Sequence, residues 1–302
     1  MLDICLLGCG GSMPVPNRSL TSMLVSINGS KLLIDCGEGT QVSMKILGCG
    51  FKTIDTICFT HYHADHIAGL PGLLLTIGNS GRTELLTIIG PTGLKNVING
   101  ITVISPMLPY ELRLIEVEDN YYSIELNNMI IHTINCEHTM KCLGYSIEVK
   151  RRKKFNKEKA QLNDVPIKLW STLQRGESIN FNGKFFLPNM VLGDERKGIK
   201  ICYITDTRPI EELINFIKKA ELFICEGMYG DDKSLEKAIK NKHMIFKEAA
   251  TLAKLGNVKE LWLTHFSPAL MVPEDYLEQT KNVFYNTIIG QDRLSKSINF
   301  EK

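Results

Sequence analysis

Three histidines and an aspartate fall within six positions of this 302-residue chain, as His61, His63, Asp65 and His66. They follow an apolar run that predicts a β-strand ending near Thr60. Burying imidazoles beside a carboxylate costs free energy unless a ligand compensates, and a divalent metal with nitrogen and oxygen ligands is the usual one. In an extended chain His61 and His63 point to one side, and the next turn can bring the other two residues to a second point about 3.5–4 Å away, the usual spacing of paired metals. The cluster therefore predicts a centre for two metals rather than a histidine-rich loop that binds nothing.

Three polar residues later in the chain could complete this centre. His138 lies in a polar connection between strands, where it is either a ligand or an inert loop residue. Asp206 ends an apolar run and is either a ligand or the cap of a helix that opens at Pro209. His265 ends an apolar strand in the way that His61 does, which favours a ligand.

The elements that must position these residues alternate between strand and helix along much of the chain. Strands are expected at 2–7, 21–27, 31–35, 85–89, 199–206, 222–225 and 261–265, and helices at 38–47, 69–78, 209–219, 246–254 and after Pro273. Residues 101–149 favour an antiparallel run of strands, with strands at 129–134 and 143–149. The alternation predicts an α/β fold, in which strands deliver polar residues from their carboxyl ends to one edge of a sheet. A strand ending in Asp and then a strand ending in Thr-His occur twice, at Asp35 and His61 and again at Asp206 and His265, which suggests two related halves.

Composition excludes a general attraction to RNA or membranes, because 35 Lys and Arg balance 33 Asp and Glu. The local exception is the segment of residues 150–159, which has seven basic residues and one acidic residue. From there to Gly193 only short apolar pieces occur, so residues 150–193 are expected to form an exposed insertion. Nine cysteines without a C-x-x-C motif, no basic leader and no apolar run of about 18 residues favour a reduced, cytoplasmic protein without a membrane span.

Taken in order, these residues resemble the metallo-β-lactamase superfamily, whose H-x-H-x-D-H signature corresponds to residues 61–66. The resemblance implies a four-layer αββα sandwich over residues 1–302, with an arm inserted at 150–193, and a centre of two zinc ions. It also implies that His61, His63 and His138 hold one zinc. Asp65, His66 and His265 would hold the other, with Asp206 bridging the two.

Within that superfamily the chain is similar to the ribonuclease Z family, endonucleases that trim tRNA precursors at the 3′ end. The similarity rests on Thr60 to Leu73, on Thr205 to Arg208, on Glu226 with the later His243, and on Leu263 to Ser267. It implies a homodimer, precursor tRNA as the partner, and a basic arm that grips the RNA. The residues implied to contact the substrate are Arg18, Arg151, Arg152, Lys153, Lys154 and Ser267.

The resemblance assigns the remaining catalytic work to three side chains. His243 would protonate the leaving 3′ oxygen, while Glu226 or Asp65 orients its ring. Two Zn²⁺, two aspartates and one hydroxide would leave the centre with a charge of about +1, which attracts a phosphodiester.

Two other kinds of function remain open from the sequence. Another hydrolase of the same superfamily, either a general phosphodiesterase or a thioester or lactone hydrolase, would use the same ligands. A thioester or lactone hydrolase gains nothing from a basic arm or from a histidine kept for a leaving alkoxide. A non-catalytic RNA-binding module with a structural zinc conflicts with a ligand set large enough for two metals, because structural zinc is usually closed by four ligands. A zinc-dependent endoribonuclease is therefore the expectation.

Overall fold

The computed structural model describes residues 1–105 and 107–301, which form two compact units. The larger unit comprises residues 1–148 and 199–299, and we call it the body. The smaller unit comprises residues 149–198 and the C-terminal residues from Phe300, and we call it the arm. Within the part of the chain that is described, no helix is long and apolar enough to cross a membrane.

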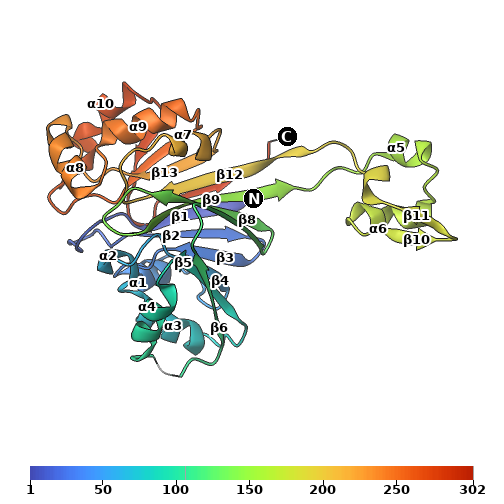
Figure 1. Ribbon diagram of the computed structural model, residues 1–302, viewed down its shortest axis with the longest axis horizontal. Helices are drawn as coiled ribbons and strands as arrows, with labels where there is room; N and C mark the ends of the chain where they lie inside the picture. Colours follow the sequence, from blue (N-terminus) through green and yellow to red (C-terminus); the bar gives the residue numbers. More distant parts are fainter. Residues whose placement is uncertain (106, 302) are drawn as a thin grey trace. The chain divides into compact units, whose positions relative to one another are not determined.

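The first sheet of the body has seven strands and contains both ends of the body's sequence (Figure 1). Its order is β16 (Ser295–Ile298), β1 (Leu2–Gly8), β2 (Ser22–Ile27), β3 (Ser30–Ile34), β4 (Ile54–Cys58), β5 (Leu86–Pro91) and β6 (Leu112–Val117). Strands β1 to β3 are antiparallel, and an Asn28-Gly29 hairpin turn joins β2 to β3 with positive φ at both residues. Strands β3 to β6 are parallel neighbours, and β4 and β5 are buried along nearly their whole length, as parallel strands with covered faces usually are.

The second sheet repeats this arrangement with seven more strands. Its order is β15 (Thr287–Ile289), β14 (Leu261–Thr264), β13 (Leu222–Glu226), β12 (Arg196–Ile204), β9 (Cys142–Arg151), β8 (Met129–Cys136) and β7 (Tyr121–Leu126). Strands β7 to β9 are antiparallel, whereas β12 to β15 are parallel. The first Asp and Thr-His residues of the repeated pattern lie at the ends of strands of the first sheet, and the second Asp and Thr-His residues lie at the ends of strands of the second sheet.

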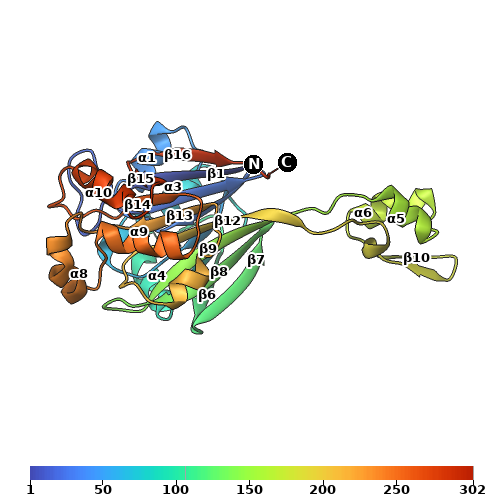
Figure 2. The ribbon, with the colours of Figure 1, turned by 90° about the horizontal axis from the view of Figure 1, so that it is seen from above.

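Helices cover the outer face of each sheet, which confirms the expected four-layer αββα sandwich (Figures 1 and 2). The first sheet carries α1 (Thr40–Ile46), α2 (Ala64–Ile67), α3 (Leu70–Asn79) and α4 (Leu94–Thr102). The second carries α7 (Glu212–Phe216), α8 (Leu235–Asn241), α9 (Phe246–Leu255), η3 (Asp232–Ser234), η4 (Pro273–Tyr276) and α10 (Leu277–Lys281). Between the sheets, the Tyr145 hydroxyl donates to the Phe59 carbonyl at 2.6 Å, and the hydroxyls of Tyr203 and Thr21 lie 3.1 Å apart.

Two parts of the body differ from the sequence expectation. The antiparallel run expected over residues 101–149 is wrong for β6, which lies in the first sheet parallel to β5, so that only β7 to β9 are antiparallel. The end of the chain forms two strands after the expected helix, β15 and β16, of three and four residues. Strands this short have too few residues to show an alternating pattern, and their pairing with β14 and β1 comes from the tertiary fold.

The arm has a hydrophobic core of its own, although its sequence offers only short apolar pieces. Its elements are α5 (Lys157–Leu162), η1 (Ile167–Leu169), α6 (Trp170–Gln174), β10 (Ile179–Phe181), β11 (Lys184–Phe186) and η2 (Pro188–Met190). These elements together bury Ala160, Val165, Leu169, Leu173, Phe186 and Val191. Each piece is too short to indicate a core by itself, but the turns between them bring the pieces into contact.

Candidate metal centre

Three residues at the centre lie just beyond the end of a strand and have a positive φ. Asp35 follows β3, Asp206 follows β12 and His265 follows β14, with φ values of 58°, 50° and 58°. Residues other than glycine rarely adopt this left-handed conformation, which is tolerated where the surrounding structure fixes it and which is common at functional sites. The bend turns each side chain from its strand toward the edge where the carboxyl ends of the parallel strands meet.

The structure brings all seven predicted ligands together in overlapping groups. His61, His63, His138 and Asp206 form one group, Asp65, His66 and His265 form another, and Asp206, His243 and His265 form a third, each with its ligand atoms within 4.8 Å of one another. The two carboxylate oxygens of Asp206 face different groups. Its Oδ2 lies 3.7 Å from both His61 Nε2 and His138 Nε2, while its Oδ1 lies 3.4 Å from His66 Nε2 and 3.1 Å from His265 Nε2. This is the arrangement that a carboxylate bridging two metals requires.

Hydrogen bonds to protein oxygens fix which nitrogen three of the rings present to the centre. The His66 Nδ1 lies 2.9 Å from an Asp35 carboxylate oxygen, and the His138 Nδ1 lies 3.2 Å from the Lys242 carbonyl. The His61 Nδ1 lies 3.1 Å from the Thr60 hydroxyl. Each ring therefore directs Nε2 inward, because outer partners of this kind set the tautomer and orientation of a metal-binding histidine.

For His61, His138 and Asp206 the environment favours the protonation state that a metal ligand needs. Burial lowers the pKa of the His61 imidazole well below its usual value, and burial also lowers the pKa of His138. Burial alone would raise the pKa of Asp206, but the rings of His265, His66 and His61 outweigh it and hold that pKa well below its usual value. Burial opposes charge on His66, yet Asp206 and Asp35 raise its pKa well above its usual range. The proton held there is the one that a bound cation would displace.

The residues present fit a divalent metal. The His61 Nε2 lies 2.9 Å from His63 Nδ1, the His138 Nε2 lies 3.3 Å from the same atom, and the His66 and His265 Nε2 atoms lie 3.2 Å apart. Two nitrogens bound tetrahedrally to one zinc at 2.0–2.1 Å are about 3.3–3.4 Å apart. The buried Asp206 Oδ1 has no hydrogen-bond partner among the described residues. An unpaired carboxylate oxygen that faces the ring nitrogens of His66 and His265 is explained by an ion between them.

His243 and Glu226 form a pair beside this centre. The His243 Nδ1 lies 3.0 Å from a carboxylate oxygen of the fully buried Glu226, which also accepts hydrogen bonds from the backbone nitrogens of Thr207 at 2.6 Å and Met244 at 3.2 Å. Burial lowers the pKa of His243, but Glu226, Asp206 and Asp65 outweigh it and raise that pKa to about 9. The ring is thus held by Nδ1 and keeps its Nε2 free for a proton transfer.

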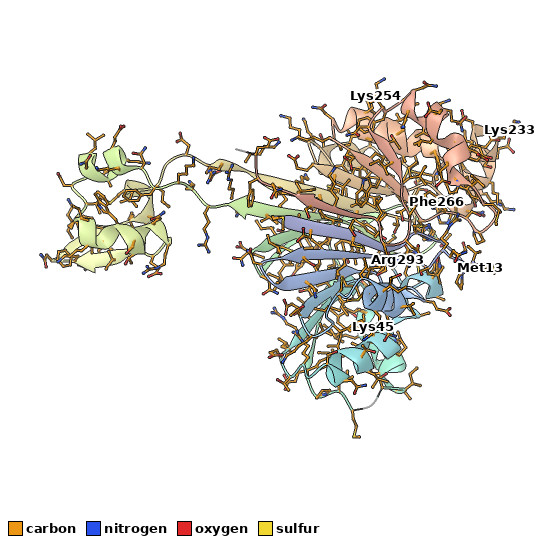
Figure 3. All side chains as sticks on the ribbon, turned by 180° about the vertical axis from the view of Figure 1, so that it is seen from behind. Met13, Lys45, Lys233, Lys254, Phe266 and Arg293 are labelled. Carbon is orange, nitrogen blue, oxygen red and sulfur yellow. The ribbon has the colours of Figure 1, made fainter. Side chains whose placement is uncertain are left out.

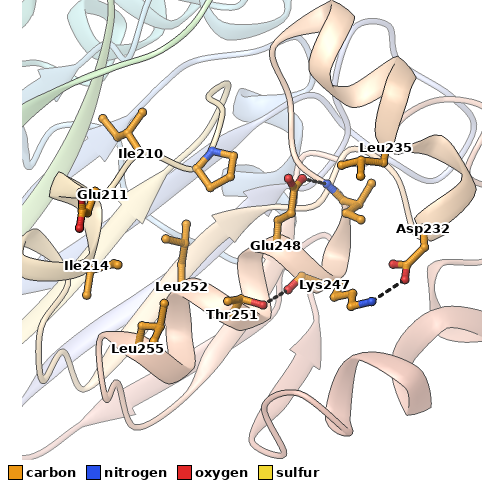
Figure 4. A pocket seen from close by; sticks show the side chains of 12 residues that line it. Ile210, Glu211, Ile214, Asp232, Leu235, Lys247, Glu248, Thr251, Leu252 and Leu255 are labelled. Carbon is orange, nitrogen blue, oxygen red and sulfur yellow. Dashed lines mark hydrogen bonds and ion pairs between the residues drawn. The ribbon is translucent and has the colours of Figure 1, made fainter.

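An ion pair that the sequence did not indicate supports the backbone of His243. The Arg208 guanidinium donates to the His243 carbonyl and pairs with both oxygens of the Glu248 carboxylate. Glu248 also accepts from the Ile245 backbone nitrogen at 3.1 Å, at the wall of an apolar pocket of about 550 Å³ formed by residues of α7, α8 and α9 and the loops beside them (Figure 4). None of the seven predicted metal ligands lines that pocket. The pocket is thus not the metal centre, but Glu248 at its wall steadies the loop of His243.

The residues predicted to contact substrate lie in different settings. Arg18 donates to the carbonyls of Leu270 at 2.9 Å and Met271 at 3.3 Å, so its guanidinium already ties two backbone segments together. Ser267 is nearly buried and its hydroxyl accepts from the Ala269 nitrogen at 3.3 Å. The four basic residues are in the arm: Arg151, whose side chain donates to the Glu301 carbonyl, Arg152, Lys153, which lies 3.5 Å from Glu195, and Lys154. Their contact with RNA stays a prediction.

Two groups at the centre were missed by the reasoning from sequence. Asp35 accepts from the Thr60 backbone nitrogen at 2.8 Å and from its hydroxyl at 2.9 Å, besides holding His66. The repeated pattern of a strand ending in Asp was a signal for it, but did not reveal its role. The Ser12 backbone nitrogen donates to Asp65 Oδ2 at 2.6 Å, and no side-chain pattern could have revealed a backbone donor.

This chain is similar to known proteins in sequence and in fold. A family model described as Anti-Pycsar protein Apyc1 matches residues 2–99. The chain is similar to Ribonuclease Z of Clostridium acetobutylicum, with 58% identity over 100% of this chain and 99% of that protein, and to Ribonuclease Z of Clostridioides difficile, with 55% identity over 100% of both. Among solved structures, the short form of human tRNase Z is similar with a TM-score of 0.72 and 24% identity, over 99% of this chain and 100% of that chain. At that identity the structural similarity shows a common fold.

Proposed function

This chain belongs to the ribonuclease Z family, and from that premise we propose how its residues share the work of an endoribonuclease that processes the 3′ end of tRNA precursors. The reaction is the hydrolysis of one phosphodiester bond. The observation that carries the proposal is the group of seven converging ligands with Asp206 between its two parts, in a chain that shares 58% identity with a ribonuclease Z along its whole length.

We assign two zinc ions to the centre. His61, His63 and His138 would hold one, Asp65, His66 and His265 would hold the other, and Asp206 would contact both through its two oxygens. When bound there, the ions supply Lewis acidity toward the phosphate and an activated water at neutral pH. Asp35 holds the His66 ring in place, and the Lys242 carbonyl does the same for His138.

His243 is the proposed general acid. Its Nδ1 is held by Glu226 at 3.0 Å, so the opposite nitrogen can donate a proton to the 3′ oxygen as the bond to phosphorus breaks. A ribose 3′ oxygen is a poor leaving group without that proton. Burial lowers the pKa of this ring, but Glu226 raises it more strongly, which favours the protonated form that a general acid needs. The Asp65 Oδ2 lies 3.5 Å from His265 Nε2, so Asp65 lies among the proposed metal ligands. This position favours Glu226 over Asp65 as the group that orients His243.

The arm is the proposed grip for the RNA. Residues 150–159 bring seven basic residues and one acidic residue to one end of this unit. Contacts between such side chains and phosphates release counterions from the RNA and give binding that weakens with salt. Residues Arg151, Arg152, Lys153 and Lys154 are the contacts that we propose.

We also propose a homodimer in which the arm of one subunit serves the centre of the other. Helices α1 and α3 leave Val42, Ile46 and Leu75 exposed, which is an apolar surface that a second copy could cover. A mixed dimer tests this directly. One subunit would lack the arm and the other would carry His63→Ala, and recovered cleavage would require an arm that acts across the dimer. No recovery in a purified mixed dimer would mean that each arm serves its own centre.

The cytoplasm is the proposed location, because nine free cysteines, most of them buried, suit a reducing compartment.

The test of the proposed function is incubation of the zinc-loaded protein with a 3′-extended tRNA precursor and with bis(p-nitrophenyl) phosphate. We expect a single cut near the 3′ end of the tRNA body and slower turnover of the small ester. Turnover of the small ester alone would indicate a general phosphodiesterase, and binding of RNA without cleavage would indicate a binding module.

A further inference from the structure

The segment of residues 9–20, between β1 and β2, touches the metal centre with its backbone; we call it the β1–β2 loop. Its Ser12 nitrogen donates to Asp65 Oδ2 at 2.6 Å. Its Gly11 packs closely against the His265 ring, so that a Cβ added at Gly11 would lie only 2.6 Å from the ring carbon Cε1. The loop therefore contacts two ligands of the same predicted zinc, one by a hydrogen bond and one by packing.

A single buried carboxylate holds both ends of this loop. Asp292 lies between β15 and β16, and its side chain is 5% exposed. One oxygen accepts from the Cys9 backbone nitrogen at 3.2 Å and the other from the Ser19 backbone nitrogen at 2.7 Å. An ionised acceptor makes stronger hydrogen bonds than a neutral one, and two such bonds fix the entry and the exit of the loop.

The loop is also joined to the backbone that follows His265. The Gly11 nitrogen donates to the Phe266 carbonyl at 3.0 Å, and the Phe266 nitrogen donates to the Cys9 carbonyl at 2.9 Å. In Figure 3, Met13 marks the β1–β2 loop and Phe266 marks the segment after β14. Arg293, which follows Asp292 in the sequence, is also labelled there. A displacement of the loop at Asp292 would thus be passed on to His265 as well as to Asp65.

We propose that Asp292 is a positioning residue for the metal centre: by holding the β1–β2 loop at Cys9 and Ser19, it sets the places of Asp65 and His265. This inference rests on the proposed function only in requiring that the centre binds metal. Removing an outer partner of a metal site typically weakens metal binding by about 10–100-fold. Asp292 acts through one further segment, so we expect the lower end, about tenfold, for the zinc held by Asp65, His66 and His265.

The test compares Asp292→Asn and Asp292→Ala with the control Glu260→Gln, all in the full chain. Glu260 is also a nearly buried carboxylate, which accepts from Trp262 Nε1 at 2.7 Å, but it lies before β14 and thus at the end of that strand away from His265. The measurements are zinc content, zinc dissociation in competition with a chromophoric chelator, and the visible spectrum of the Co²⁺-substituted protein. Thermal unfolding of each variant reports on folding separately.

We expect both Asp292 variants to release one of two zinc ions about tenfold more readily and to change the Co²⁺ spectrum, while Glu260→Gln lowers the melting temperature without either effect. Wild-type zinc release and an unchanged spectrum in Asp292→Asn would overturn the inference, as would the same change in Glu260→Gln. If Asp292→Ala does not fold, Asp292→Asn decides, because it keeps the shape and replaces only one acceptor. A wild-type protein that binds two zinc ions but leaves tRNA precursors intact would refute the proposed substrate and not this inference.

Discussion

The body and the arm carry opposite net charges. The body has 22 Lys and Arg against 27 Asp and Glu, a net charge of −5, whereas the arm has 13 against six, a net charge of +7. Their interiors differ as well, because the body buries two large apolar clusters on its sheets and the arm buries one small cluster. The positive arm attracts the phosphates of RNA, whereas the negative net charge of the body repels them.

From this difference we expect the body to determine the rate of hydrolysis and the arm to determine the affinity for RNA. The body holds every proposed metal ligand together with His243 and Glu226, and the arm holds four of the six residues proposed to bind substrate. Changes in the body should therefore affect all phosphodiesters, and changes in the arm should affect only those with an RNA to grip.

Removing a metal ligand should have the largest effect. His63→Ala and Asp206→Ala are expected to lose zinc and nearly all hydrolysis of both precursor tRNA and bis(p-nitrophenyl) phosphate, because each variant removes a proposed ligand from the centre. Metal analysis and both turnover assays measure this. Full zinc content with wild-type turnover in Asp206→Ala would show that Asp206 does not bridge the metals.

His243→Ala should keep its zinc but slow tRNA cleavage by about 10²–10⁴, the usual contribution of a general acid. The loss should be smaller with bis(p-nitrophenyl) phosphate, because p-nitrophenolate leaves without a proton. The comparison of the two substrates is the measurement, with zinc content as the control. Equal losses on both substrates would contradict the role of proton donor.

Deleting most of the arm should separate the two units by function. Replacing residues 152–195 with a short Gly-Ser bridge is feasible because the Gly193 nitrogen donates to the Lys154 carbonyl at 2.8 Å, so the two segments are adjacent there. We expect precursor tRNA binding to weaken by about 10²-fold and to lose much of its salt dependence, with the small ester hydrolysed as before. Unchanged tRNA cleavage would show that the arm is not the grip.

Glu226→Gln should change the pH profile more than the maximum rate. Glu226 raises the pKa of His243, so its replacement by a neutral amide lowers that pKa, and the ring loses its proton at lower pH. The alkaline limb of the tRNA cleavage profile should therefore move to lower pH, with a loss of about tenfold at pH 8. A profile that moves the other way, or a loss of zinc, would assign Glu226 a different role.

The smallest effect is expected for two lysines of the arm compared with two of the body. Lys153→Ala with Lys154→Ala should weaken precursor tRNA binding a few-fold and reduce the salt slope by about 0.7–0.9 for each phosphate that the variant no longer neutralises. Lys233→Ala with Lys254→Ala, which removes the same charge from exposed positions of the body, should leave the slope unchanged (Figure 3). Equal changes in both pairs would mean that total charge, and not the arm, governs binding.

The sequence by itself determined the layered α/β fold and pointed to the metal centre. Four ligands lie within a window of six positions, so their convergence follows from local geometry. The strands before Asp206 and His265 were recognisable from apolar runs. The α/β class follows from the alternation of strand and helix signals, because the apolar period of each strand or helix can be read within one short segment. The small core of the arm and strands β15 and β16 escaped prediction because their segments are shorter than any reliable period.

The family resemblance assigned His138 and His265 to the centre, but only the tertiary structure decided the distances and contacts that hold distant residues together. His63 faces His138 across 75 positions, His66 faces His265 across 199, and Asp292 holds Ser19 across 273. The same is true of Arg18, whose guanidinium proved to bind the carbonyls of Leu270 and Met271. Contacts of this kind depend on strand order and on backbone donors and acceptors, and these leave no local pattern in the side chains. Periodicity and spacing report the neighbours along the chain, while the packing of two sheets determines the neighbours across it.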